Sequence, residues 1–324
     1  MSVHRKVVVK NAFRITKTRG ETALRIRVPG GHLETRYFDL IKKIAEEYGN
    51  GTVHMTTRQG FEIPGIDFSK MEEINAQIIP LLEMLKPSFK VDDHGYPAAG
   101  TRNISACIGS RVCPFANDDT TLRAAQLERS VFPHDLHFKI AVTGCPNDCI
   151  KAHMQDFGII CTTEPEYDAS KCISCNACVD NCEKRVTGAL EMKEFDIERD
   201  KQRCIGCGEC VMKCPTGAWS RSETKYYRMV IMGRTGKKNP RIAMPFVKWA
   251  TFDVIEAIIK NTYGFVDRYI DRNLAKEHIG YIVDRQGYLK FKEEVLEGVV
   301  LNPEIQIAEH IDFGGYLYKS DSNF

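Results

Sequence analysis

Cysteine spacing is the feature of this chain that most constrains its fold. Of the 13 cysteines, eight fall in two runs of the same pattern, Cys172-x₂-Cys175-x₂-Cys178-x₃-Cys182 and Cys204-x₂-Cys207-x₂-Cys210-x₃-Cys214. Three cysteines at two-residue gaps wrap one face of an iron–sulfur cube, and the fourth cysteine of each run ligates the other cube. The spacing therefore predicts two [4Fe–4S] clusters, one held by Cys172, Cys175, Cys178 and Cys214 and one by Cys204, Cys207, Cys210 and Cys182.

The two runs also predict a separate domain, a ferredoxin-like insertion at residues 166–220 that carries electrons. The first run departs slightly from the usual pattern, because Glu183 follows its last cysteine where Pro215 follows that of the second run. Zinc is the alternative ligand for so many thiols. A zinc ion takes one tetrahedral quartet, and this disagrees with the interleaved spacing.

Four more cysteines form a second, less generic pattern: Cys107-x₅-Cys113 and Cys145-x₃-Cys149. With Pro146 after the first of the later pair, the spacing predicts that Cys145 to Cys149 opens a helix with both sulfurs on one face. Such a quartet is compatible with a structural zinc or with a further iron–sulfur cluster. Cys161 matches no ligand spacing, and we expect it to be a buried strand residue.

Hydrophobic periodicity predicts an α+β chain on either side of the insertion. Residues 1–90 are expected to form a small α+β unit, and residues 91–165 with 221–324 a core domain. The expected elements are strands at 21–28, 53–57, 61–63, 137–143, 157–162 and 226–232, and helices at 36–48, 69–85, 117–130 and 252–259. Ser69 and Glu72 are expected to cap the second of these helices. The tail from Ile279 is expected to form a helix and a strand.

Composition excludes several classes of protein. The 324 residues carry a net charge of only +2, which gives no case for binding nucleic acid. The sequence has no apolar run of the length of a membrane span and no signal peptide, so we expect a cytoplasmic protein. Clustered cysteines in a cytoplasmic chain indicate metal ligands rather than disulfides. No dinucleotide-binding glycine motif follows a strand, so electrons are expected from a partner.

Several motifs together resemble those of the sirohaem nitrite/sulfite reductases. They are Thr56-Thr57-Arg58-Gln59, the two cysteine pairs, and Gly144-Cys-Pro-Asn-Asp-Cys149; the insertion after the second pair is similar to the dissimilatory and anaerobic sulfite reductases. The resemblance implies a ferredoxin-like half-domain followed by an α/β sirohaem-binding core. It also implies that the second quartet holds a third [4Fe–4S] cluster, and that Cys149 additionally ligates the sirohaem iron. The implied reaction is the six-electron reduction of sulfite to sulfide.

The resemblance further implies a set of cationic site residues. Substrate-binding arginines fall on Arg27, or its neighbour on the same strand face Arg25, and on Arg102; the family's lysine pair falls on His137 and Lys139. The histidine is a departure, although it remains a proton donor. Candidates for the carboxylates of sirohaem are Thr57, Arg58, Gln59, Asn103, Arg111, Asn147, Arg234, Lys237, Lys238 and Arg241. The alternative for the arginines is a solvated surface charge, and for residues 233–241 an exposed hairpin turn.

The assembly is also an expectation from the resemblance. Related enzymes carry two copies of the α/β unit and this chain carries one, so we expect a homodimer or a larger complex, with a ferredoxin-like subunit and a flavin/NADH subunit as partners. Three other functions stay open at this point. They are reduction of nitrite to ammonia, electron transfer without sirohaem, and a zinc-bound interaction module.

Overall fold

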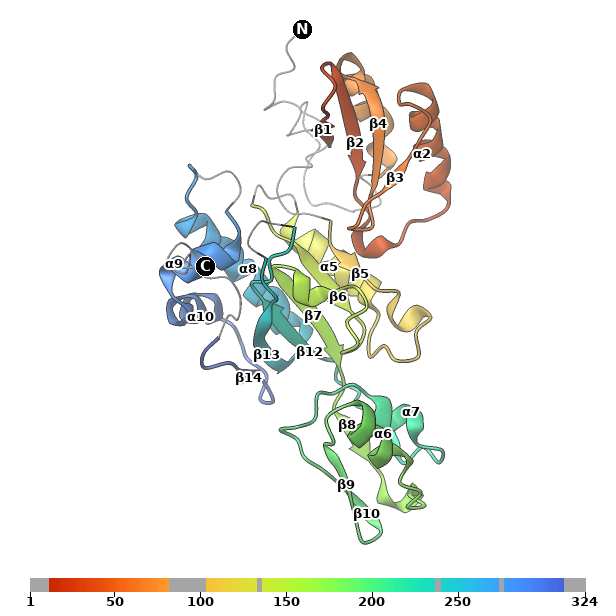
Figure 1. Cartoon of the computed structure of the whole chain (residues 1–324), viewed down its shortest axis with the longest axis vertical. Coiled ribbons are helices and arrows are strands. Elements are labelled where there is room, and N and C mark those ends of the chain that lie inside the picture. Colours follow the sequence, from red (N-terminus) through yellow and green to blue (C-terminus); the bar gives the residue numbers. More distant parts are fainter. Residues whose placement is uncertain (1–11, 82–102, 133–135, 237–239, 274–276, 312–324) are drawn as a thin grey trace, which may run out of the picture.

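The computed structural model describes residues 12–81, 103–132, 136–236, 240–273 and 277–311. It has a mixed α+β fold in three parts that follow one another along the long axis of the molecule (Figure 1). An N-terminal half-domain lies at one end, the core domain in the middle, and the cysteine-rich insertion at the other end. Arg102, Lys237 and Lys238, which the sequence places in the site, lie outside the described residues.

The half-domain is a four-stranded antiparallel sheet covered by helices. Its sheet has the order β1-β2-β4-β3. Its elements are β1 (Phe13–Ile15), β2 (Glu21–Ile26), α2 (Arg36–Glu47), β3 (His54–Met55), β4 (Phe61–Asp67) and α3 (Met71–Gln77). Alternation in β2 and helical spacing in α2 bury Leu24, Ile26, Ile41 and Ile44 in one core, as amphipathic elements should.

In α2, Tyr37 is buried, whereas Phe38 is 46% exposed with its ring against Phe61. One detail of the half-domain differs from the sequence predictions. The predicted Ser69–Glu72 capping box is wrong. Asp67 accepts a hydrogen bond from the Ser69 backbone N–H instead and starts a short 3₁₀ turn at residues 68–70, so α3 begins only at Met71.

The core domain is a six-stranded mixed sheet of order β14-β13-β12-β7-β6-β5, in which β5, β6 and β7 are parallel and the other pairs antiparallel. Helices pack on the sheet and bury one large cluster of apolar side chains. The elements are β5 (Ser105–Ala106), α5 (Thr120–Val131), β6 (Ile140–Thr143), β7 (Phe157–Thr162), β12 (Tyr226–Ile231), β13 (Met244–Ala250), α8 (Phe252–Tyr269), α9 (Ile279–Gln286), α10 (Tyr288–Leu296) and β14 (Gln306–Ile307).

Element types in the core agree with the sequence predictions, but several bounds do not. The predicted strand at 157–162 has the observed bounds, whereas α8 extends ten residues beyond the predicted end at 259. Helix α5 begins later than expected because Asp119, not Asn117 or Asp118, caps it by accepting the N–H groups of Thr121 and Leu122. The tail contains two helices before its short strand.

The insertion leaves the core at the end of β7 and returns to it at the start of β12. Strands β8 (Pro165–Tyr167) and β11 (Trp219–Arg221) pair antiparallel where the insertion joins the core. Beyond them lie α6 (Ala177–Arg185), the hairpin β9 (Leu190–Lys193) and β10 (Asp196–Arg199), and α7 (Glu209–Lys213), with the hairpin farthest from the core in Figure 1. No helix of the described residues is long and apolar enough to span a membrane.

Candidate functional site: three sets of thiols

The core sheet brings the four cysteines of the less generic pattern together; we call Cys107, Cys113, Cys145 and Cys149 the core thiols. Cys107 follows β5 and Cys145 follows β6, and these strands are parallel neighbours, so both cysteines leave the sheet at the same edge. The N–H of Gly144 donates to the Cys107 sulfur at 3.1 Å, and the Cys113 N–H donates to the carbonyl of Gly109 at 2.9 Å. The turn at Gly109 therefore folds Cys113 back toward the sheet edge.

The segment from Cys145 to Cys149 is not a helix, so that prediction is wrong. Asp148 has a left-handed backbone (φ 48°), and its N–H donates to the carbonyl of Cys145 in a turn. Its carboxylate accepts the N–H groups of Ala152 and His153 at 2.6 and 3.1 Å and contacts His153 Nδ1 at 2.7 Å. An aspartate that satisfies backbone donors this way favours a turn over a helix interior.

The core thiols differ in how far they reach solvent. Cys145 is buried, Cys107 and Cys113 are half-buried, and Cys149 is exposed. Burial raises the pKa of the Cys145 thiol, a backbone hydrogen bond at Asn147 opposes that shift, and the charges of Cys113, Cys149 and Cys107 add to it. All three other core thiols are thus electrostatic neighbours of Cys145. As expected, Cys161 is a fully buried strand residue.

One set of insertion thiols surrounds a cavity of its own, and we call Cys172, Cys175, Cys178 and Cys214 the outer thiols. All four line one cavity, whose other walls include Ile197 and Trp219. Backbone N–H groups point at the sulfurs, with Ser174 donating to Cys172 at 3.4 Å and Ala218 donating to Cys214 at 3.2 Å. Burial alone would raise the pKa of Cys214, but hydrogen bonds from Thr216, Trp219 and Ala218 lower it to about 7.

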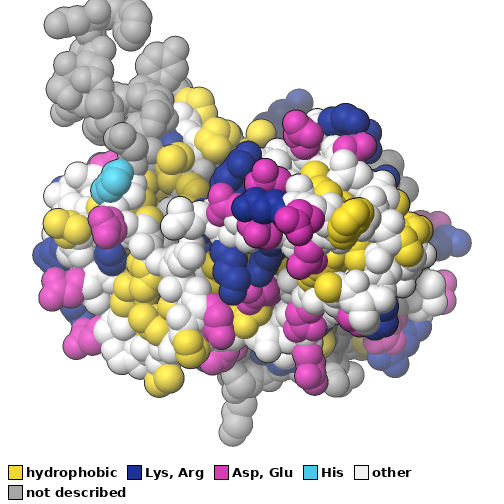
Figure 2. All heavy atoms as spheres, turned by 90° about the horizontal axis from the view of Figure 1, so that it is seen from below, with side chains coloured by type: hydrophobic (Ala, Val, Ile, Leu, Met, Phe, Trp, Pro, Cys, Tyr) yellow, Lys and Arg dark blue, Asp and Glu magenta, His cyan; other side chains and the backbone are white. Residues whose placement is uncertain are grey.

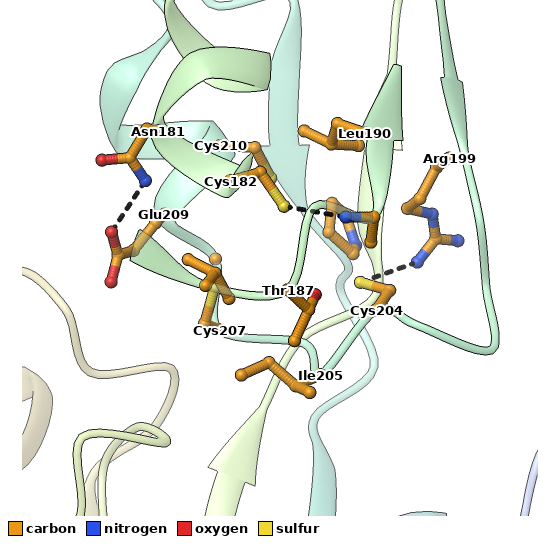
Figure 3. A pocket seen from close by; sticks show the side chains of 14 residues that line it. Asn181, Cys182, Thr187, Leu190, Arg199, Cys204, Ile205, Cys207, Glu209 and Cys210 are labelled. Carbon is orange, nitrogen blue, oxygen red and sulfur yellow. Dashed lines mark hydrogen bonds between the residues drawn. The ribbon is translucent and has the colours of Figure 1, made fainter. Parts of the chain in front are cut away.

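The other set, Cys182, Cys204, Cys207 and Cys210, surrounds a second cavity; we call these the inner thiols (Figure 3). The Ala189 N–H donates to Cys182 at 3.3 Å, and Arg199 donates to Cys204 at 3.7 Å. Burial raises the pKa of Cys207 to about 11 and that of Cys210 to about 12. In both sets the last cysteine of each run joins the first three of the other run, which is the interleaving that the spacing predicts.

The donor chemistry of these sets fits iron–sulfur clusters. Each of the two insertion sets presents four thiols around a cavity, and in all three sets at least one backbone N–H group donates to a sulfur, as such groups do to cluster ligands. Among the described residues no group of three or more Cys, His, Asp or Glu side chains converges closely enough for a single metal ion.

The two predicted substrate arginines, Arg25 in β2 and Arg27 directly after it, are both engaged by carboxylates. Arg27 is 3% exposed, and its Nε and Nη2 contact Glu128 Oε1 of α5 at 2.6 and 2.5 Å. Arg25 contacts Glu62 Oε1 at 2.8 Å on the neighbouring strand. Neither arginine is the solvated surface charge of the alternative interpretation, because Arg27 is buried and Arg25 is only 28% exposed. Glu128 is a partner that the sequence did not suggest.

His137 and Lys139 are half-buried and alternate with buried residues, so they share a face. They lie just before β6, which begins at Ile140 and not at the predicted residue 137. Lys139 Nζ donates to the carbonyl of Thr235 at 2.9 Å. The His137 ring packs edge-on against that of His278, with 5.8 Å between centroids.

Sequence reasoning missed a buried pair behind these two residues. His278 and Asp156 are each 1% exposed and joined through Nδ1 and Oδ1 at 3.0 Å. Asp156 Oδ2 also accepts the backbone N–H of Lys139 at 3.0 Å. No motif marks His278, because it lies 122 residues from Asp156 in the chain.

Three of the predicted sirohaem residues join the half-domain to the core instead of facing open space. Arg58 donates to the carbonyls of Asn103 and Ile140 at 2.8 and 3.0 Å and to Gln155 at 2.6 Å. Gln59 exchanges two hydrogen bonds with the backbone of Ala106, and Asn103 bonds the backbone of Val28 and of Arg58.

The remaining sirohaem candidates divide into two groups. Thr57 and Asn147 are exposed, and Arg111 is 40% exposed beside Asp119 and His32. Arg234 and Arg241 face each other in a hairpin bridge, as the alternative expected, but the hairpin arginines are buried rather than exposed. Arg241 pairs with Asp284 at 2.9 Å, and Arg234 stacks on the ring of Tyr281 at 3.9 Å.

Comparisons with known proteins agree with this architecture. Residues 98–301 match the family described as "Nitrite and sulphite reductase 4Fe-4S domain", and residues 14–81 match "Nitrite/Sulfite reductase ferredoxin-like half domain". The solved structure titled "Crystal structure of dissimilatory sulfite reductase I (DsrI)" shares the fold, with a TM-score of 0.67 at 17% identity over 92% of this chain and 73% of that one.

Curated proteins extend the similarity over almost the whole sequence. The chain is 43% identical over 311 residues to a subunit of the anaerobic sulfite reductase of Salmonella typhimurium, which covers 94% of this chain and 92% of the relative. It is 31% identical over 286 residues to the "Coenzyme F420-dependent sulfite reductase" of Methanocaldococcus jannaschii, 86% of this chain and 43% of that protein. The thiol sets, the fold and these matches together show that the chain belongs to the family of sirohaem nitrite and sulfite reductases.

Proposed function

We propose that this chain is the catalytic subunit of a sulfite reductase. It would reduce sulfite to sulfide with six electrons at a sirohaem and a [4Fe–4S] cluster. Cys149 would help to hold both groups, and the insertion thiols would hold two further [4Fe–4S] clusters that supply electrons. The observation that carries the proposal is that Cys107 and Cys145 leave neighbouring parallel strands at one sheet edge, where the Gly109 turn folds Cys113 back and Cys149 is exposed.

The graded exposure of the core thiols supports separate roles for them. A cluster needs all four thiolates, whereas only an exposed sulfur also has room for a second ligand on its outer side. Cys145 is therefore assigned to the cluster alone and Cys149 to both groups. When bound, the sirohaem supplies an iron at which the sulfur of sulfite accepts electrons.

The surface around the core thiols suits a macrocycle with an apolar face and carboxylate edges. Ile108 and Val112, which lie between Cys107 and Cys113, are 53% and 74% exposed although they are apolar. Arg111 in the same segment offers a guanidinium, which pairs well with carboxylates. Large exposed apolar side chains next to a cationic group are typical of a ligand-binding surface.

Protons and positive charge near the substrate are assigned to His137 and Lys139, and anion binding to Arg102 and to either Arg27 or Arg25. Of the latter two, Arg25 is 28% exposed and Arg27 is 3% exposed in its pair with Glu128. An anion that loses its oxygens as water requires both donors and cations. The Asp156–His278 pair holds the stretch that carries His137 and Lys139 through the backbone N–H of Lys139.

Electrons are proposed to enter at the outer thiols from partner subunits, one ferredoxin-like and one carrying flavin and using NADH. Cys175 is exposed, and so are the apolar side chains Ile173 (64%) and Phe195 (84%), whose segments join through a hydrogen bond from Ser174 to the carbonyl of Phe195. Figure 2 looks at the insertion end and shows acidic and basic side chains mixed with apolar ones on that face.

The optical spectrum of the anaerobically purified protein is the direct test. Sirohaem absorption bands, together with sulfite-dependent oxidation of a reduced viologen, are expected. Protein that contains iron and labile sulfide but lacks sirohaem bands would instead support an electron-transfer subunit.

Nitrite is the second candidate substrate. The chain is 30% identical over 158 residues to the chloroplastic ferredoxin–nitrite reductase of Arabidopsis thaliana, which covers 46% of this chain. Steady-state kinetics with each anion and the same viologen decide between them. We expect the higher kcat/KM with sulfite.

A homodimer is proposed because the chain holds one copy of the α/β unit, and a symmetric pair is the simplest way to supply a second. Size-exclusion chromatography with light scattering tests this, and a catalytically competent monomer would contradict it.

A further inference from the structure

The two cavities of the insertion differ in what surrounds them. Every residue that lines the cavity of the outer thiols belongs to the insertion. Cys204, an inner thiol, also lines a small cavity together with residues of β7, β12 and β13 of the core. The N–H of Thr163, the residue after β7, donates to the carbonyl of Gly206 at 3.0 Å. The inner thiols therefore lie on the side of the insertion that touches the core sheet.

Asn117 of the core reaches across this boundary with its side chain. It is 4% exposed. Its Nδ2 donates to the carbonyl of the inner thiol residue Cys207 at 3.5 Å and to that of Cys161 at 3.3 Å, and its Oδ1 accepts from Arg221 Nε at 3.0 Å. Gly208 admits this close approach, because a Cβ there would lie 2.8 Å from Asn117 Oδ1.

The backbone of Asn117 reaches the core thiols. Its N–H donates to the carbonyl of Gly144 at 2.7 Å, one residue before Cys145. The preceding N–H, of Ala116, donates to the carbonyl of Cys113 at 3.2 Å. Cys207, Asn117, Gly144 and Cys145 thus form one connection of covalent and hydrogen bonds, and electronic coupling falls off more slowly through bonds than through empty space.

We propose that Asn117 is the positioning residue that couples the inner thiols to the core thiols, and that electrons enter at the outer thiols and pass through the inner ones. This inference rests on the proposed function. Each transfer oxidises the cluster held by the inner thiols by one electron and reduces the cluster held by the core thiols by one electron, and no covalent bond forms or breaks.

A single-turnover experiment on the holoenzyme tests the proposal. Anaerobic protein is fully reduced with titanium(III) citrate, freed of reductant, mixed with sulfite and frozen at intervals for electron paramagnetic resonance. Wild-type protein should oxidise its core centre in a fast phase and its insertion clusters in a later one. In Asn117→Ala the fast phase should be unchanged and the later phase slower by about tenfold or more, the scale at which outer partners of a metal site affect activity.

The matched control is Asn181→Ala. Asn181 also lines the cavity of the inner thiols and is 9% exposed, but its side chain donates to Glu209 within the insertion. This variant should keep both phases. If the Asn117→Ala protein loses iron, the experiment is repeated with Asn117→Asp. Its carboxylate still accepts a hydrogen bond from Arg221 but cannot donate one to the carbonyl of Cys207.

The order of the clusters is tested with Cys175→Ser, which removes an outer ligand. The later phase should lose amplitude but keep its rate, since the inner cluster remains next to the core. A stalled later phase would reverse the proposed order, and unchanged phases in an iron-replete Asn117→Ala would overturn the role of Asn117. A wild-type core centre that sulfite does not oxidise would instead contradict the proposed function.

Discussion

Replacement of Glu128 by glutamine should destabilise the protein strongly, because it removes the partner of a buried charge. Arg27 and Glu128 are 3% and 2% exposed, the pair is 2.5–2.6 Å apart, and the guanidinium stacks over the Phe132 ring at 4.1 Å. Breaking one side of such a pair costs roughly 3–5 kcal/mol of the free energy of unfolding, since the other charge stays buried. Replacing both by apolar residues of similar volume is often close to neutral.

The free energies of unfolding of the wild type and the variants are measured by urea unfolding under anaerobic conditions, followed by far-ultraviolet circular dichroism. Glu128→Gln should lower the free energy of unfolding by roughly 3–5 kcal/mol. The double variant Arg27→Met/Glu128→Leu should recover most of that loss. A loss below about 1 kcal/mol for the single variant would refute the buried pair, because that is the range of an exposed pair. If the double variant loses as much stability as the sum of the two single variants, Arg27 and Glu128 do not stabilise each other.

The same double variant separates the two roles of Arg27. If Arg27 binds substrate, a folded double variant with normal cluster content should still show a raised KM for sulfite. A wild-type KM would leave Arg27 with the structural role alone.

The remaining predictions concern the joints between the parts. Arg58→Lys loses the fork of hydrogen bonds to Asn103, Ile140 and Gln155 and should cost about 2–3 kcal/mol in urea unfolding, while Arg129→Lys on the exposed side of α5 should stay within about 0.5 kcal/mol. Cys149→Ser should lose sirohaem bands and activity but keep the two insertion clusters by electron paramagnetic resonance; equal loss of all centres would contradict the assignment. Gly206→Ala places a Cβ 2.9 Å from Thr162, Thr163 and Trp249 and should cost about 1–3 kcal/mol more than Gly217→Ala, whose left-handed backbone is similar but whose surroundings are open. Equal costs for the two glycine variants would mean that backbone strain, not the contact with the core, decides.

The sequence was most informative where neighbours along the chain decide the structure. The spacing of the insertion cysteines predicts which four line each cavity, because a loop of two residues between ligands leaves little freedom in how they wrap. The amphipathic helix α2 was predictable for a similar reason, since its period alone shows which face is buried, whereas all six residues of β7 are buried and give no such signal.

Contacts between distant segments account for most of what the sequence could not predict. Arg27 meets Glu128 across 101 residues, and no local pattern distinguishes a buried arginine from an anion-binding one. Asp148 shows a second limit. Proline after Cys145 is compatible with a helix start, but the carboxylate of Asp148 satisfies the N–H groups of Ala152 and His153 and thereby favours a turn.

The place of the insertion explains how a second domain joins this core without disturbing its sheet. Thr162, the last residue of β7, is the register partner of Tyr226, the first residue of β12, so the two ends of the insertion leave from adjacent antiparallel strands. A short hairpin turn would be enough to connect β7 to β12. The insertion takes the place of that turn, and its own first and last strands, β8 and β11, pair with each other. Because β7 is also the parallel neighbour of β6, which leads to Cys145, the same sheet fixes the inner thiols relative to the core thiols. A rigid sheet thus sets the separation between the two sets of thiols, which a flexible linker could not do.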